Sequence, residues 1–177
     1  MKAVLKVAQN FLKYSYDFSS VQVNLPENIA NEIYTWGLKH IPDNILSEKG
    51  RESQIHITVK YGLHITDFTM VRNLFINFVK PICVTLKKIT LFNNEDCDVV
   101  KIDVSSPDLI KLNKLISNEF ETTDTYPNYI PHVTVAYIKK GYDNIYNNLN
   151  VFEGRKIFIG SVEFSGRDNR KTIFNFL

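Results

Sequence analysis

A four-residue pattern, His-apolar-Thr-Val, occurs twice in this chain and constrains its fold more than any other feature. The copies are His56-Ile57-Thr58-Val59 and His132-Val133-Thr134-Val135. In a β-strand, successive side chains point to opposite faces, so the imidazole and the hydroxyl of each copy share one face and the apolar residues share the other. The chain has four His, and two of them begin this pattern. Each copy therefore predicts a strand with one buried face and a short polar row on the other.

The order of the predicted elements around each motif is also repeated. Strand, helix, polar loop, His-Thr strand, helix and strand follow one another in residues 18–92 and again in residues 97–164. Such a repeat indicates an internal duplication. We predict a single α+β domain over residues 1–177, with two pseudo-symmetric lobes formed by these repeats. Each lobe has a mainly antiparallel sheet flanked by helices, and the active-site cleft lies between the lobes.

Hydrophobic periodicity, together with Pro, Ser and Gly signals, gives the expected boundaries. Helices are predicted over residues 26–41, 67–79, 106–120 and 142–149, and residues 1–13 fit either a short amphipathic helix or an ordered tail. Strands are predicted over residues 18–25, 82–92, 97–104, 151–164 and 171–176, besides the two His-Thr strands. The polar segments 47–53 and 121–129 are predicted as loops that precede the two motifs.

Composition limits the classes of protein that this chain can represent. It has 177 residues, 44% of them hydrophobic, which is enough for one sizeable core. A net charge of +2 permits a polyanionic ligand without arguing for one. Cys83 and Cys97 are expected to be reduced, and no apolar run is long enough to cross a membrane. We therefore expect a cytoplasmic protein with no membrane partner and no need for a long nucleic acid; the sequence predicts no oligomeric state.

Two imidazoles facing one cleft can act as base and acid on opposite sides of a phosphodiester, because imidazole titrates near neutral pH. The hydroxyls of Thr58 and Thr134 can then hold the charge that grows on the phosphate oxygens. Carboxylates do not cluster around either motif, so no metal or other cofactor is expected. His56 with His64 suggests zinc only weakly, since a third and a fourth ligand are missing. His64 itself fits either a role near the site or a plain turn position.

The paired motifs, in a duplicated α+β chain of this length, resemble those of the 2H phosphoesterases. This superfamily includes RNA 2′-5′ ligase-like proteins, cyclic nucleotide phosphodiesterases and viral enzymes that destroy 2′-5′ oligoadenylates. The resemblance covers the chain from about Phe18 to its end. It implies that His56, Thr58, His132 and Thr134 are catalytic.

The stretch Gly50-Arg51-Glu52, followed by the first motif, resembles a narrower branch that contains phage anti-CBASS nucleases and poxvirus relatives. These cleave cyclic oligonucleotide immune messengers, so the resemblance implies a viral immune-evasion protein acting in the host cytoplasm. In that branch an aromatic residue near the N-terminus and a Glu near the C-terminus help to hold a base; Asn169 stands about where a further aromatic residue is expected. The substrate-binding residues predicted here are Tyr16, Tyr61, Tyr137, Glu163 and Arg51.

Each tyrosine can serve in packing instead, which is the commoner role of a single tyrosine.

The predicted activity is metal-independent cleavage of a cyclic or linear oligonucleotide. The favoured substrate is a cyclic oligonucleotide messenger. Two enzymatic alternatives stay open: a phosphodiesterase acting on 2′,3′-cyclic RNA ends, and one acting on 2′-5′ oligoadenylate. A non-catalytic nucleotide-binding sponge is the alternative from another class.

Overall fold

The computed structural model describes residues 16–76, 80–124, 126 and 128–176. The helix or ordered tail expected over residues 1–13 lies outside the described residues. The strands are β1 (Ser19–Asn24), β2 (Leu46–Arg51), β3 (His56–Leu63), β4 (Ile82–Asn93), β5 (Asp98–Ser105), β6 (His132–Ile138), β7 (Lys156–Ile159), β8 (Ser161–Ser165) and β9 (Lys171–Asn175). The helices are α2 (Glu27–His40), α3 (Phe68–Ile76), α4 (Pro107–Glu119) and α5 (Asp143–Tyr146), with a 3₁₀ turn at Asp43–Ile45.

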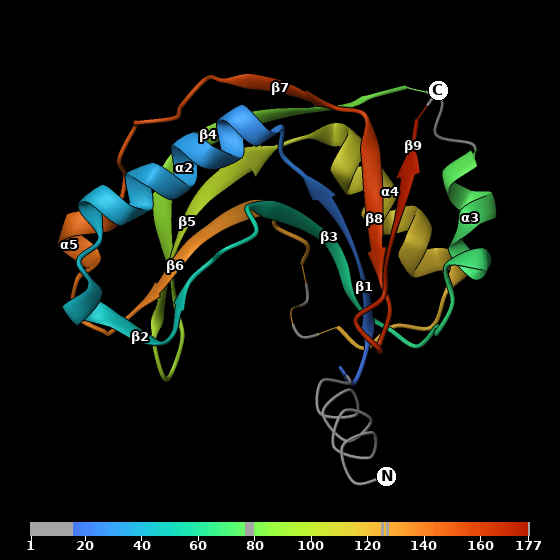
Figure 1. Cartoon of the computed structure of the whole chain (residues 1–177), viewed down its shortest axis with the longest axis horizontal. Coiled ribbons are helices and arrows are strands. Elements are labelled where there is room, and N and C mark those ends of the chain that lie inside the picture. Colours follow the sequence, from blue (N-terminus) through green and yellow to red (C-terminus); the bar gives the residue numbers. More distant parts are fainter. Residues whose placement is uncertain (1–15, 77–79, 125, 127, 177) are drawn as a thin grey trace, which may run out of the picture.

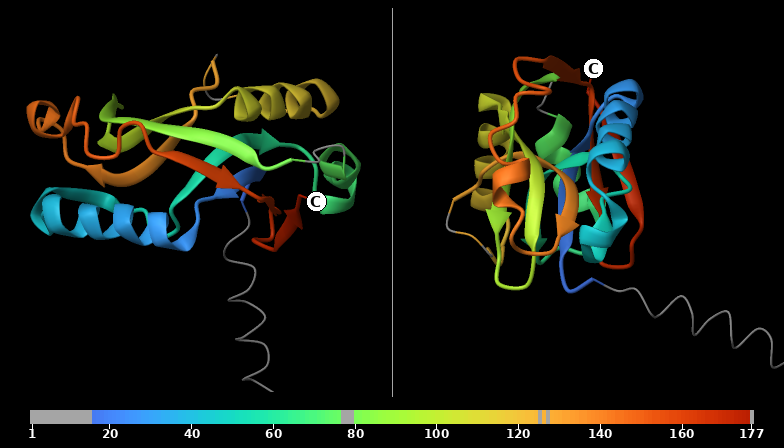
Figure 2. Two further views of the ribbon diagram at one scale, coloured as in Figure 1. Left: turned by 90° about the horizontal axis from the view of Figure 1, so that it is seen from above. Right: turned by 90° about the vertical axis from the view of Figure 1, so that its left-hand side faces the viewer.

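Among the described residues, nine strands form one continuous sheet in the order β7-β4-β5-β6-β3-β1-β8-β9, and β2 pairs with β6. Every pairing between these strands is antiparallel. The sheet curls into an open arch (Figure 1). Helices α2 and α4 lie on opposite sides of the strands in both views of Figure 2. The predicted α+β class, with antiparallel strands flanked by helices, is confirmed.

The two His-Thr strands, β3 and β6, are neighbours at the centre of this order, and the strands outward from them correspond pairwise. One half of the sheet runs β3-β1-β8-β9, and the other runs β6-β5-β4-β7. The repeat over residues 18–92 ends with β4, which lies beside β5 in the other half. The repeat over residues 97–164 ends with β8, which lies beside β1. The sheet therefore does not divide at the repeat boundary, because each repeat places its last strand in the opposite half.

The helices are exchanged in the same way. Helix α2 packs on β6, and a Cβ atom added to Gly37 would lie 3.0 Å from Cγ1 of Val135, so glycine permits the close approach. Helix α4 packs on β3, where the Asn113 amide donates a hydrogen bond of 2.7 Å to the Val59 carbonyl. Ser106 begins α4 as an N-cap, since its hydroxyl accepts from the Leu109 amide at 3.2 Å. The helix of each repeat is thus fixed by specific contacts to the motif strand of the other repeat.

Apolar faces of the helices pack against the strands and complete the core. The fully buried helix positions include Ile33 in α2, Val71 and Phe75 in α3, and Leu109, Leu112 and Ile116 in α4, whereas Leu115 in α4 is exposed. Burial of one such aliphatic or aromatic side chain stabilises a fold by about 1.5–3 kcal/mol. Cys83 and Cys97 are free thiols, as expected. No helix in the described part of the chain is both long and apolar enough to span a bilayer.

Three predicted segments were wrong, and one of them is the helix expected over residues 142–149, which is limited to α5 because Leu149 bridges to Ile89. Residues 47–53 were expected as a loop, but Leu46–Arg51 form β2. This strand lacks apolar alternation and is held by its backbone, with Leu46 and Arg51 paired to Ile138 and Ala136 of β6. Residues 151–164 were expected as one strand, but they contain β7 and β8, which separate at Gly160 and join different halves of the sheet.

Candidate active site

Strands β3 and β6 bring the two motifs together. Ile57 pairs directly with Val133, and both side chains are fully buried. In this antiparallel register, His56 lies opposite Thr134, and Thr58 lies opposite His132. These four side chains occupy the other face of the two strands, where each is half-buried. The structure therefore places the two imidazoles and the two hydroxyls diagonally across one small patch at the centre of the sheet.

Each imidazole is fixed by the backbone in the same way. His56 Nδ1 lies 2.6 Å from the Gln54 carbonyl oxygen, and His132 Nδ1 lies 2.8 Å from the Ile130 carbonyl oxygen. A carbonyl only accepts hydrogen bonds, so Nδ1 carries the hydrogen in both rings. The Nε2 atom of each neutral ring then carries no hydrogen, so it is the nitrogen that can accept a proton. The two histidines are thus oriented and tautomerically matched before any ligand binds.

The surroundings of His132 favour its neutral form. Burial lowers the pKa of His132, although the hydrogen bond to Ile130 acts in the opposite direction. The charge of Lys101 also lowers this pKa, whereas the charge of Asp103 raises it. Phe92 packs edge-on against the His132 ring, with 4.9 Å between the ring centroids. A desolvated imidazole of this kind can accept a proton near neutral pH.

A cavity of about 430 Å³ opens beside the first motif. It is lined by the three predicted tyrosines and by several polar side chains from β1, β3 and the β8–β9 turn. Its lining residues are Tyr16, Phe18, Ser20, Gln22, Glu52, Gln54, His56, Thr58, Tyr61, Tyr137, Ser165, Gly166, Asn169 and Lys171. His132 and Thr134 are not among them. The cavity therefore reaches β6 through Tyr137 and extends mainly over the half of the sheet that contains β3.

Glu163 lies behind this cavity wall rather than in it, with 4% of its surface exposed. Its carboxylate accepts from Gln22 at 3.2 Å and from Asn24 at 2.8 Å, and Lys171 Nζ lies 3.0 Å away. Burial by itself would raise the pKa of Glu163, but the hydrogen bonds from Lys171, Asn24 and Gln54 hold that pKa below its ordinary value. The carboxylate is therefore charged, and it orients two residues that do line the cavity.

Arg51 lies apart from the other predicted substrate-binding residues. Its guanidinium forms an ion pair of 2.5 Å with Asp43 and also donates to the Ile41 carbonyl. Both partners follow the end of α2, and Arg51 is not among the residues that line the cavity. In this arrangement Arg51 connects β2 to the segment after α2.

The loop before the second motif is attached to β3 beside the cavity. Gly62 has a φ of +82°, and a Cβ atom on it would lie 2.0 Å from the Thr123 carbonyl oxygen. The Thr123 amide donates to the Gly62 carbonyl at 2.8 Å, and the Tyr129 hydroxyl donates to the Thr58 carbonyl at 3.0 Å. His64 contacts this loop through the Thr123 hydroxyl at 2.7 Å. His64 therefore helps to hold the loop, and it lies near the site but outside the cavity.

Several polar residues around the site were not predicted. Gln22 and Lys171 line the cavity, while Lys101 and Asp103 flank the second motif. Polar alternation in Ser19–Asn24 and in Asp98–Ser105 is the signal that could have found three of them, because it places them on the face shared with the motifs. Lys171 belongs to β9, which forms a local hairpin with β8, and only the long-range pairing of β8 with β1 brings it to the site.

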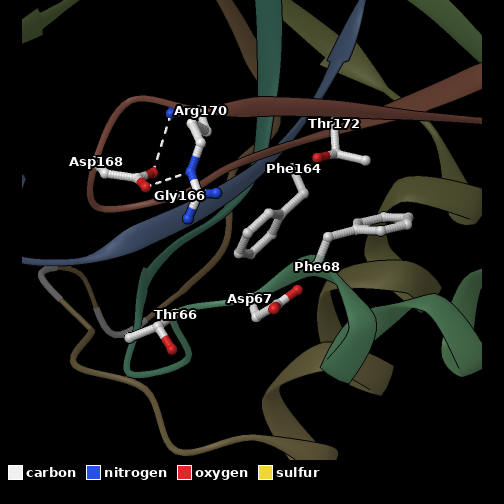
Figure 3. Close-up of a pocket in the computed structure, with 8 residues that line it drawn as sticks. All are labelled: Thr66, Asp67, Phe68, Phe164, Gly166, Asp168, Arg170 and Thr172. Carbon is white, nitrogen blue, oxygen red and sulfur yellow. Dashed lines mark hydrogen bonds and ion pairs between the residues drawn. The ribbon is translucent and has the colours of Figure 1, made fainter.

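A second, smaller cavity of about 100 Å³ lies under the β8–β9 turn (Figure 3). Phe68 and Phe164 form its apolar side, and Asp168 and Arg170 bond to each other at its rim. Gly166 lines both cavities, so the turn separates them. Among the described residues, no group of three or more His, Cys, Asp and Glu could hold a metal ion.

The class of fold is recognisable from solved structures. The chain matches a crystal structure of a phosphoesterase, with a TM-score of 0.57 and 14% identity over 90% of this chain and 95% of that one. It also matches apo LigT of E. coli, with a TM-score of 0.59 and 18% identity over 92% of this chain and 96% of that one. The LigT complex with 3′-AMP matches with a TM-score of 0.57 and 16% identity over 90% and 94%. The chain therefore has a LigT-like fold.

No protein-family model matches this chain, and no curated protein sequence matches it. At these levels of identity the likeness describes the fold, and the chemistry depends on the site itself.

Proposed function

We propose that this protein is a metal-independent phosphodiesterase that cleaves a small nucleotide. One observation carries the proposal. Two histidines on adjacent strands each direct Nδ1 to a backbone carbonyl, at 2.6 Å and 2.8 Å, and each has a motif threonine opposite. A packing histidine needs no such duplicated arrangement, whereas a base and an acid acting on one phosphorus do.

The proposed reaction uses only side chains of this chain. One neutral imidazole accepts the proton of an attacking hydroxyl, and the other, protonated, donates to the leaving oxygen. The hydroxyls of Thr58 and Thr134 donate to the non-bridging oxygens, on which charge grows in the transition state. In a 3′-5′ linkage the attacking group is the adjacent 2′-hydroxyl, which leaves a cyclic phosphate that water can open. In a 2′-5′ linkage the 3′-hydroxyl takes that part.

The substrate that we propose is a cyclic oligonucleotide of the kind used as an immune messenger. A cavity of about 430 Å³ is within the range that holds a small ligand. Tyr16, Tyr61 and Tyr137 offer faces on which bases can stack. Glu163 acts through Gln22 and Lys171, which its carboxylate orients. Solved LigT structures include complexes with ATP and with 3′-AMP, which supports a nucleotide ligand.

Arg51 contributes to substrate binding in this proposal only if it leaves Asp43, its partner at 2.5 Å. Asp43→Asn separates the two roles of Arg51. It weakens the ion pair without changing the cavity, so a KM that falls in this variant indicates that the released guanidinium reaches the substrate.

Product analysis tests the proposed function. The purified protein is incubated, with and without EDTA, with cyclic dinucleotides and trinucleotides, 2′-5′ oligoadenylate and RNA ending in a 2′,3′-cyclic phosphate. We expect cleavage of a cyclic oligonucleotide at the same rate in EDTA. Preference for a linear 2′-5′ or an RNA-end substrate keeps the phosphodiesterase and replaces the substrate. Loss of turnover in EDTA, restored by zinc or manganese, refutes the mechanism. Ligand that binds and is recovered intact after denaturation identifies a sponge.

A further inference from the structure

The polar row that begins at the first motif continues into β1 through neutral amides. Gln22 pairs with Thr58, and Asn24 pairs with His56. Residues directly opposite in an antiparallel pair lie on the same face. The side chains beside the first histidine and threonine on this strand therefore carry no charge, and the buried anion Glu163 is one strand further away, opposite Gln22.

The corresponding row from the second motif carries an ion pair. Lys101 pairs with Thr134, and Asp103 pairs with His132, in β5. The order β3-β1 on one side of the centre corresponds to β6-β5 on the other. Lys101 and Asp103 thus take the positions that Gln22 and Asn24 have in the first half. The two histidines are alike in geometry, yet their flanking charges differ.

Lys101 is held firmly in this row, with only 4% of its surface exposed. Its ammonium donates to the Thr90 hydroxyl at 2.7 Å and to Asp103, and it lies 4.1 Å from the centre of the Phe92 ring. The second oxygen of Asp103 accepts from the Thr90 hydroxyl at 3.0 Å. Lys101 and Thr90 therefore occupy both oxygens of the carboxylate that lies beside His132.

Lys101 is also connected to His132 by packing. The Phe92 ring contacts the ammonium and meets the His132 ring edge-on, with 4.9 Å between the ring centroids. Around His132, the charged and titratable groups are Lys101 and Asp103 on β5 and His56 on β3. His132 Nδ1 is bonded to the Ile130 carbonyl. Lys101 and Asp103 on β5 therefore act on His132 through their charges and not through a hydrogen bond to Nδ1.

We propose that Lys101 is a positioning residue that makes His132 the base of the reaction and leaves the acid role to His56. This inference rests on the proposed phosphodiesterase function. Lys101 acts in two ways: its charge disfavours a proton on His132, and it engages Asp103, whose free carboxylate would stabilise the imidazolium.

The assigned roles balance the reaction. As the attacking oxygen bonds to phosphorus, its proton moves to Nε2 of His132. As the bond from phosphorus to the leaving oxygen breaks, Nε2 of His56 gives its proton to that oxygen. Product release and proton exchange with water return both rings to their starting states.

Histidine NMR titration tests the action of Lys101 without any need for turnover. The His132 resonance is assigned by its loss in His132→Asn. We expect Lys101→Gln to raise the pKa of His132, Asp103→Asn to lower it and Lys101→Arg to leave it close to the parent. Lys156→Gln, which removes an exposed strand lysine, is the matched control. Opposite shifts from two neighbouring substitutions cannot arise from a general loosening of the fold.

Lys101→Gln leaves Asp103 without its cation and can destabilise the fold. The double variant Lys101→Gln/Asp103→Asn removes both charges. Its His132 should have a pKa between those of His132 in the two single variants. Asp103→Asn alone still tests the proposal if the lysine variant does not fold, because unpaired Lys101 then acts on His132 without opposition.

Kinetics test the base assignment. We expect Lys101→Gln to reduce kcat/KM about three- to tenfold on the acid side of the pH profile, with little change above neutral pH, and Lys101→Arg to restore it. KM should stay within about twofold, since Lys101 is buried away from the cavity.

An unchanged His132 titration in all the folded variants overturns the proposal. A shifted titration with an unmoved acid limb overturns the base assignment. A parent protein that cleaves no phosphodiester refutes the proposed function instead, and NMR then still decides whether Lys101 sets the protonation of His132.

Discussion

At the scale of single residues, two backbone carbonyls decide which nitrogen of each histidine is available for chemistry. Gln54 and Ile130 each precede their histidine by two positions and accept from its Nδ1. The backbone thus performs at both sites the orienting role that a carboxylate performs in many histidine-dependent enzymes. Because no side chain supplies it, this orientation cannot be removed by substituting a partner.

Asparagine substitutions separate this orienting bond from the proton transfer. In His56→Asn and His132→Asn, the amide nitrogen can donate to the same carbonyl, but no atom replaces Nε2. Each variant should stay folded and lose activity by about 10²–10⁴. The double variant should be little worse than either single one, because the two groups act as a unit.

Turnover at saturating substrate, beside circular dichroism of the same samples, is the measurement. A single variant that turns over near the parental rate while folded shows that the pair is not catalytic. For the parent, log rate against pH should be bell-shaped, and its limbs report the coupled pair.

The threonine hydroxyls are tested by replacements that keep the side-chain shape. Thr58→Val and Thr134→Val remove the hydroxyl and should each reduce kcat by about 10²–10³, because the donor acts on charge that develops in the transition state. Thr→Ser at either position keeps the hydroxyl and should retain most of the rate. If the valine and serine variants are equally active, the threonines serve packing alone.

At the scale of elements, the site depends on a loop that the chain brings back to β3. Gly62 and Thr123 lie so close that a side chain at Gly62 has no room. The same loop leads into β6 and thereby carries His132 to its place beside β3. The separation of the two histidines is therefore set partly by this backbone contact.

Gly62→Ala tests that contact, with Gly154→Ala as its control. The two glycines have φ values of +82° and +85°, but nothing lies within 4 Å of a Cβ atom added at Gly154. We expect the control to cost about 1 kcal/mol of unfolding free energy through backbone strain alone. Gly62→Ala should cost about 2 kcal/mol more, through overpacking, and should lower kcat. Urea unfolding measures both, and equal costs would show that the loop moves aside freely.

The sequence predicted the elements whose pattern is local. Alternation around His56 and His132 predicted β3 and β6, and helical periodicity predicted α2 and α4 to within about two residues. Strand β2 was missed because its backbone pairing with β6, and no apolar alternation, makes it a strand. The separation of β7 from β8 was missed because their partners, β4 and β1, lie far away in the sequence.

The same reasoning applies to the site. The motif residues could be predicted because each copy carries its own pattern. Lys171 could not be placed beside Gln54 from the sequence, although the two form a hydrogen bond, because its hairpin β8–β9 joins β1 only at long range.

At the scale of the whole molecule, the cluster around Glu163 joins three strands of one half of the sheet. Gln22 and Asn24 belong to β1, Glu163 to β8 and Lys171 to β9. Since the folded protein holds the pKa of Glu163 below its ordinary value of 4.5, the charged carboxylate stabilises the fold above that pH. This stabilisation is lost as the pH falls below the ordinary value.

Glu163→Gln should therefore be less stable than the parent at pH 7, by about 2 kcal/mol, because the amide replaces a charged acceptor. The difference should shrink as the pH falls below 4.5, where the carboxylate takes up a proton in the unfolded chain before it does so in the folded protein. Urea unfolding of both proteins at pH 7 and at pH 3.5 measures it. A difference that is the same at both pH values would assign the loss to packing.

The exchange of last strands has a consequence for how this chain can be divided. A cut in the turn between β4 and β5 would give two fragments with one motif histidine each. Neither fragment would contain a complete half of the sheet, because β4 belongs beside β5 and β8 belongs beside β1. The fragments could regain the fold only as an obligate heterodimer, in which the first donates β2 and β4 and the second donates β8 and β9. Base and acid would then come from different polypeptides, so activity would require association and would rise with fragment concentration.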